Sequence, residues 1–124
     1  MSDDTPKEPV HPREHFVDLG CTIRPNWKAM DLPWYGAYSQ EPCTERSLTV
    51  QYIPSADGVT PEQLRTWWPE ALVAEGWVET SRSPVRGNGN QTFRYALPDG
   101  RNALLTVTPR EGLWWVSISV SPAP

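Results

Sequence analysis

Histidine is scarce in this chain, and its positions exclude several kinds of chemistry. The two histidines, His11 and His15, both lie close to the N-terminus. Nucleophilic catalysis by a Ser–His or Cys–His pair needs an imidazole within hydrogen-bond distance of the nucleophile. Pro12 lies between the two histidines, so a helical pair of metal ligands is not expected there. We interpret both as residues of a solvated tail and expect no metal site.

Long apolar runs and basic stripes are also lacking. No apolar run approaches the roughly 20 residues that an α-helix needs to span a bilayer. Lysine and arginine are scattered among a larger number of aspartates and glutamates, and the net charge is −4. Nucleic-acid binding relies on clustered positive charge. We therefore expect neither a nucleic-acid partner nor insertion into a membrane.

The carboxylates and the glycine-rich stretch have structural explanations. Glu62 and Glu70 fit the first turns of helices, where acidic side chains are favoured. Asp99 and Glu111 lie in turn sequences. The stretch 87–90, Gly-Asn-Gly-Asn, lacks the spacing of a phosphate-binding loop and precedes a strand rather than a helix. We expect no catalytic residue and no cofactor, and an enzyme that uses carboxylates is the less favoured alternative.

Two cysteines, Cys21 and Cys43, are too few for a zinc site built from cysteine alone. Their spacing leaves two interpretations. They form a disulfide that closes the loop between them, which contributes about 3 kcal/mol in the chain-entropy model, or they are two reduced thiols. A disulfide indicates an extracytoplasmic or cell-envelope location, whereas free thiols are typical of a cytoplasmic protein.

Residues 1–15 are polar and proline-rich, which predicts a disordered tail or tether before a single domain over 16–124. This stretch resembles the polar tether of bacterial lipoproteins, although a flexible cytoplasmic N-terminus has the same composition. It contains no charged region followed by an apolar one, as a signal peptide would. Whether a lipid tether has been removed from the chain is left open.

One strand and one helix are predicted in the middle of the chain. Residues 47–53 alternate polar and apolar side chains, with Leu48, Val50 and Tyr52 directed inward. The helix follows over 60–75, with Thr60 as N-cap, Gln63 completing a capping box and Gly76 as the residue after its end. Pro69 lies inside this pattern, so we expect a kink or a second short helix there.

Four further strands are predicted after the helix, at 77–80, 91–97, 103–108 and 114–120, with turns at 98–100 and 109–112. Between the first two of these, residues 81–90 have the composition of a mobile loop. The chain is thus predicted to be an α+β two-layer sandwich, with an antiparallel sheet of about four to five strands in the order β-α-β-β-β-β. One kinked helix covers one face of the sheet. An irregular, aromatic-rich segment, 16–46, covers an edge or part of the other face.

Aromatic residues are the abundant feature, with seven tryptophans and four tyrosines. Trp67, Trp68 and Trp114 fit core positions. The other aromatic side chains form a candidate interaction surface, because rigid exposed rings are common at binding hot spots: Trp27, Trp34, Tyr35, Tyr38 and Trp115. Their burial against the second face of the sheet is the structural alternative.

We expect a non-enzymatic module that binds a protein partner through an aromatic, acidic surface. A cell-envelope accessory domain and an inhibitor or immunity-type protein are the candidate roles. Carbohydrate or cell-wall binding through the exposed aromatic side chains is the alternative function.

Overall fold

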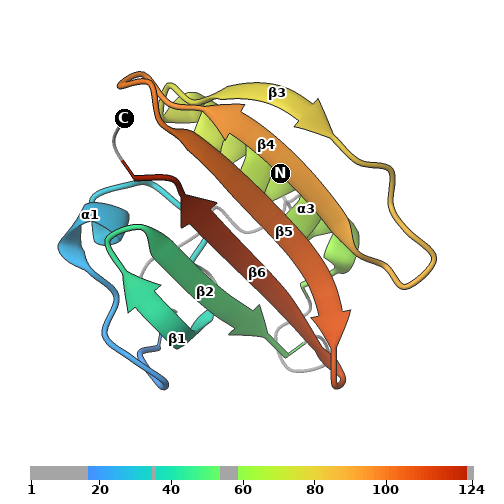
Figure 1. Cartoon of the computed structure of the whole chain (residues 1–124). Helices are drawn as coiled ribbons and strands as arrows, with labels where there is room; N and C mark the ends of the chain where they lie inside the picture. The colour runs from blue at the N-terminus through green and yellow to red at the C-terminus, as the bar shows by residue number, and fades with distance from the viewer. Residues whose placement is uncertain (1–16, 35, 54–58, 123–124) are drawn as a thin grey trace, which may run out of the picture.

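The computed structural model describes residues 17–34, 36–53 and 59–122. In chain order, its elements are α1 (Pro25–Lys28), β1 (Tyr38–Thr44), β2 (Ser47–Tyr52), α3 (Pro61–Ala74), β3 (Val78–Arg82), β4 (Gln91–Ala96), β5 (Asn102–Arg110) and β6 (Leu113–Val120). All strands belong to one six-stranded sheet in the order β1-β2-β6-β5-β4-β3, and every neighbouring pair is antiparallel. Helix α3 crosses one face of this sheet (Figure 1). The α+β sandwich is confirmed, with β1 as an additional strand.

Helix α3 has the start and the end that its sequence predicts. Thr60 and Gln63 exchange two hydrogen bonds in a capping box, with distances of 2.8 and 3.1 Å. At the other end, the N–H groups of Gly76 and Trp77 bond back to the last turn of the helix, and Gly76 has a φ of +95°. Pro69 lies inside one uninterrupted helix, so the alternative of two short helices is wrong.

The core lies between α3 and the sheet face that it covers. Apolar side chains of successive strands stand in register across this face, and one such row consists of Leu48, Ile118, Leu105 and Phe93. Helix α3 buries Leu64, Trp67, Trp68, Pro69, Ala71 and Leu72 against it. Burial of apolar area at roughly 25 cal/mol per Å² is the main stabilising contribution, and the inward side chains predicted for β2 are confirmed as part of this core.

The N-terminal segment packs on the same face as α3, beside the helix rather than on the opposite face. Trp34 contacts Trp68 of α3 edge to face, with ring centroids 6.2 Å apart. The Tyr52 hydroxyl of β2 donates to the Pro33 carbonyl at 2.7 Å. The expectation that this segment covers part of the other face is therefore wrong, because its large apolar rings complete the core that α3 covers only in part.

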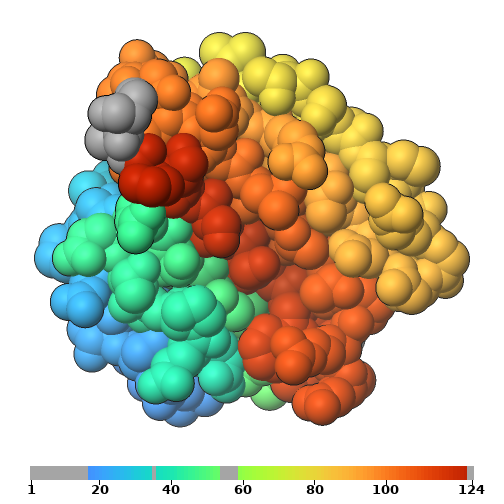
Figure 2. Space-filling view, viewed as in Figure 1, coloured from blue at the N-terminus to red at the C-terminus, as the bar shows by residue number. Residues whose placement is uncertain are grey.

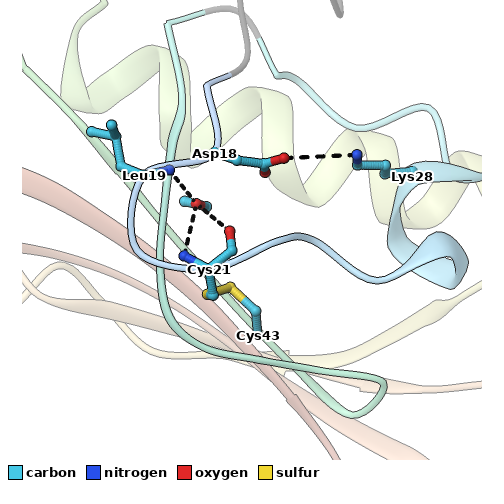
Figure 3. Close-up of polar contacts among 6 residues, drawn as sticks. Asp18, Leu19, Cys21, Lys28 and Cys43 are labelled. Carbon is cyan, nitrogen blue, oxygen red and sulfur yellow. Dashed lines mark hydrogen bonds and ion pairs between the residues drawn. A yellow bond between two sulfur atoms is a disulfide. The ribbon is translucent and has the colours of Figure 1, made fainter.

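The same segment covers the outer edge of β1, as the sequence interpretation allowed. Val17 forms an isolated bridge with Tyr38, and its backbone exchanges hydrogen bonds with Ala37 and Ser39. The Ser39 hydroxyl, fully buried, accepts from the Leu19 and Cys21 N–H groups and donates to the Cys21 carbonyl (Figure 3). An edge strand that is covered in this way cannot pair with another chain.

Strand β1 lies inside the segment that was expected to be irregular. Pro42 interrupts it, and the register of its pairing with β2 shifts between Gln40 and Thr44. Proline cannot donate to the ladder of hydrogen bonds, and a shifted register disturbs the alternation of side chains. The two-residue period by which strands are recognised is thus absent.

The loop over 81–90 begins later than predicted, because β3 continues to Arg82. The tip of the loop contacts α3, where Arg65 donates to the Gly89 carbonyl at 2.7 Å.

Within the parts of the chain that the structure describes, no helix is long and apolar enough to cross a membrane.

Candidate functional site

The two cysteines form a disulfide between the N-terminal segment and β1 (Figure 3). Cys21 and Cys43 are separated by 22 positions in the chain, and their Cα atoms lie 6.1 Å apart. The bond thus fastens the segment that covers the β1 edge. Disulfides persist in oxidising compartments, so this one is compatible with an extracytoplasmic location.

Helix α1 is held against the end of β1 by side chains that bond to consecutive carbonyls. Three donors make these bonds: Arg24 Nε to the Cys43 carbonyl (3.3 Å), Trp27 Nε1 to the Thr44 carbonyl (2.7 Å) and Asn26 Nδ2 to the Glu45 carbonyl (3.0 Å). The disulfide lies next to them in the chain. Together they fix α1 and the buried indole of Trp27 relative to the sheet.

The five aromatic residues predicted as an interaction surface are not all on the surface. Trp27 and Trp34 are 1% and 2% exposed and belong to the core. They are buried, as in the structural alternative, but on the face that α3 covers rather than on the second face of the sheet. Tyr35 lies outside the described residues. Tyr38 and Trp115 are partly exposed. The N-terminal segment therefore does not present a broad aromatic surface, since its two tryptophan rings fill the space beside α3.

Tyr38 and Trp115 lie together on the sheet face opposite α3, which we call the open face. Tyr38 of β1 pairs with Gln51 of β2, and Gln51 pairs with Trp115 of β6. Paired residues project to the same face, and strands are about 4.8 Å apart, so the two aromatic residues are separated by roughly 10 Å along one row. Figure 2 shows β2, β6, β5 and β4 reaching the surface on this face.

Polar side chains, four of them hydroxyls, form the next row of the open face. Five strands contribute to it, and their residues are in register: Gln40, Thr49, Ser117, Thr106 and Thr92. Thr49 is itself buried, whereas the other four side chains are partly exposed. In β2, β4, β5 and β6 these positions alternate with inward apolar ones, so the strand periodicity indicated them. What the sequence did not reveal was the order of the strands, which brings hydroxyl and aromatic side chains into neighbouring rows.

The charge of the open face differs from the acidic surface expected. Among the outward positions of β2, β4, β5 and β6, the charged residues are Arg94 and Arg110. The Arg110 guanidinium lies 4.8 Å from the centre of the Trp115 ring, and the indole N–H donates to the Arg110 carbonyl at 3.3 Å. The part of this face formed by β2, β4, β5 and β6 is therefore aromatic, polar and basic, although the whole chain is acidic.

Perturbed titratable groups lie elsewhere, at the β3 edge and in the turn between β4 and β5, where hydrogen bonds from Arg101 lower the Asp99 pKa. Arg82 binds both carboxylate oxygens of Glu79, at 2.7 and 2.8 Å, and this interaction lowers the Glu79 pKa. Burial raises the pKa of the neighbouring Tyr95 hydroxyl far above its usual value. No pair of nucleophile and base accompanies these groups within the described residues, nor do three potential metal ligands gather anywhere in that part of the chain.

No protein-family model, curated protein or solved structure matches the chain. The function is therefore inferred from the geometry of the site alone.

Proposed function

We propose that this protein is a non-enzymatic binding module that uses the open face of its sheet to bind a protein partner. The observation that carries this proposal is the common row of Tyr38 and Trp115, on a face that α3 does not cover. A cell-envelope accessory domain and an inhibitor or immunity-type protein both fit such a module.

The composition of the open face supports a protein partner. Tryptophan, tyrosine and arginine are the residues most enriched at binding hot spots. Arg110 restrains the Trp115 ring from one side, so little side-chain entropy is lost when a partner covers it. Arg94 is exposed on the same face. We infer that the partner presents acidic side chains here, because complementary charge directs association.

The location that we propose is extracytoplasmic, in the cell envelope or beyond it. The Cys21–Cys43 disulfide supports this, because reducing conditions in the cytoplasm keep most thiols free. A partner exposed in the same compartment is therefore the one to seek.

The test is affinity capture from an envelope extract of the source organism, with three variants beside the wild type. W115A removes the aromatic anchor and R94E reverses a charge, whereas V73A shortens an exposed apolar residue on α3. We expect one protein that binds the wild type and V73A, binds W115A and R94E at least about tenfold more weakly, and dissociates as the salt concentration rises. Equal capture by all four proteins would show that the open face is not the binding surface.

Carbohydrate binding is the second candidate, since the same row offers two rings with the amide of Gln51 between them. Tyr38 and Trp115 are the described residues of the candidate interaction surface that lie on the open face. Cell-wall fragments that shift the Trp115 indole signal in a saturable way, without any captured protein, would favour this candidate over a protein partner.

A further inference from the structure

A hollow of about 300 Å³ opens at one end of the sandwich, away from the open face. Its walls come from α1, the end of α3, the turn between β1 and β2, the turn between β4 and β5, and the last residues of β6. From the sequence, these segments are predicted to be helix ends, turns, strand ends or irregular structure. Only the fold brings them together.

The floor of the hollow is apolar and held in place. Trp27 and Trp77 contribute to it, together with Val120 from the core side of β6. The Trp27 ring is fixed by its hydrogen bond to the Thr44 carbonyl. Trp77 contacts Tyr95 edge to face, with ring centroids 6.0 Å apart. Because both rings are already packed, this floor exists before any ligand arrives.

Negative charge gathers at the rim of the hollow. Glu45, Glu75 and Asp99 line it, against the single guanidinium of Arg101. Arg101 already pairs with Asp99, at 2.9 Å. Glu75 accepts a hydrogen bond from the Asp31 N–H at 3.0 Å, which leaves its charge unneutralised. The Glu45 carboxylate makes no hydrogen bond or ion pair with any described residue.

We propose that this hollow binds an alkyl chain that ends in a cation, as a lysine side chain or a free alkyl diamine does. The methylene groups would lie on Trp27, Trp77 and Val120, and the ammonium group would lie between Glu45 and Glu75. Long cationic side chains commonly place their stems on apolar surface and their charge in a polar rim, and a nearby indole face adds attraction for the cation. The volume is at the lower limit for ligand pockets, which fits a single side chain.

This site is independent of the one proposed for the open face. Val120 belongs to the core side of the sheet, whereas Trp115 projects from the other side. Loss of one site need not affect the other, and the two attract opposite charges. A negative result at the hollow would therefore leave the proposal for the open face unchanged.

The experiment is a titration of the folded, disulfide-bonded protein followed by NMR of the tryptophan indole N–H groups. The probes are a short lysine-containing peptide, the same peptide with norleucine in place of lysine, and 1,5-diaminopentane. E45Q/E75Q removes two rim charges while keeping similar shapes, and E62Q, on an exposed residue of the first turn of α3, is the matched control. Urea unfolding of each variant establishes that it is folded.

We expect the lysine peptide to shift the Trp27 and Trp77 signals in a saturable way, and norleucine to bind more weakly. E45Q/E75Q should weaken lysine binding about tenfold, and E62Q should leave it unchanged. Tighter binding of the peptide than of the diamine would identify a polypeptide side chain as the natural ligand. Tighter binding of the diamine would identify a free amine. Absence of saturable shifts with either amine, or equal binding of norleucine, would overturn the proposal.

Discussion

The indole N–H of Trp68 donates a hydrogen bond to the hydroxyl oxygen of Tyr52, 3.0 Å away, and both side chains are fully buried. The same hydroxyl donates to the Pro33 carbonyl. Helix α3, strand β2 and the N-terminal segment therefore meet at one oxygen atom. Because a buried polar group without a partner is costly, this chain of hydrogen bonds fixes where the segment lies beside α3.

Replacement of Tyr52 by Phe tests this relationship. Y52F deprives the Trp68 N–H and the Pro33 carbonyl of these bonds without changing the packing volume much. We expect the free energy of unfolding to fall by about 1–3 kcal/mol, as measured by urea denaturation. Y38F is the matched control, because Tyr38 is partly exposed, and it should change stability by less than about 0.5 kcal/mol. Equal losses in the two variants would contradict the role given to the buried hydroxyl.

Removal of the disulfide tests the attachment of the segment that covers β1. We expect C21S/C43S to lose about 3 kcal/mol of unfolding free energy in the chain-entropy model. Amide hydrogen exchange at Gly20 and Ser39 should also accelerate, because the backbone bonds of this edge depend on a segment that is no longer fastened. Labelling of the denatured, unreduced wild type should find no free thiol. Two labelled thiols would contradict the bond and weaken the proposed location.

Local chemistry explains why α3 and the later strands were predictable. The capping pair Thr60 and Gln63, the glycine at position 76 and the alternation in β5 and β6 each act over a few residues, so the sequence carries them directly. Strand β1 lacks such a signal, because Pro42 breaks its period. It becomes a strand by pairing with β2 in a hairpin, and this pairing does not require a two-residue period in β1.

The sites were less predictable than the fold. Trp27 lies between two polar residues and Trp115 between two apolar ones, yet Trp27 is core and Trp115 is partly exposed. Burial depends on which face the N-terminal segment covers, and periodicity says nothing about that choice. Likewise, Glu45 and Glu75 meet at one rim only because two distant turns end at the same side of the sandwich.

The end of α3 provides a test of backbone conformation. Gly76 has a positive φ, and a Cβ there would meet only Pro98, at an ordinary distance of 3.6 Å. The cost of a side chain is therefore one of backbone strain rather than of space. We expect G76A to lower the free energy of unfolding by about 1 kcal/mol and G76N to lower it less, because Asn tolerates this region better. G87A is the control, as nothing lies near a Cβ there, and a G76A protein as stable as G87A would exclude the strain.

The ion pair at the β3 edge predicts a specific pH dependence. Hydrogen bonding and charge from Arg82 hold the Glu79 pKa below its usual value in the folded protein. A lowered folded-state pKa means that the stabilisation is complete above the usual glutamate pKa and is lost as the pH falls through the lowered one. NMR titration of the side-chain carboxyl carbon should therefore give Glu79 a midpoint below the usual glutamate value. R82Q should return the midpoint toward the usual value, and R82K, which keeps the charge but not the paired geometry, should give an intermediate one. A Glu79 midpoint that R82Q leaves unchanged would show that the contact does not persist in solution.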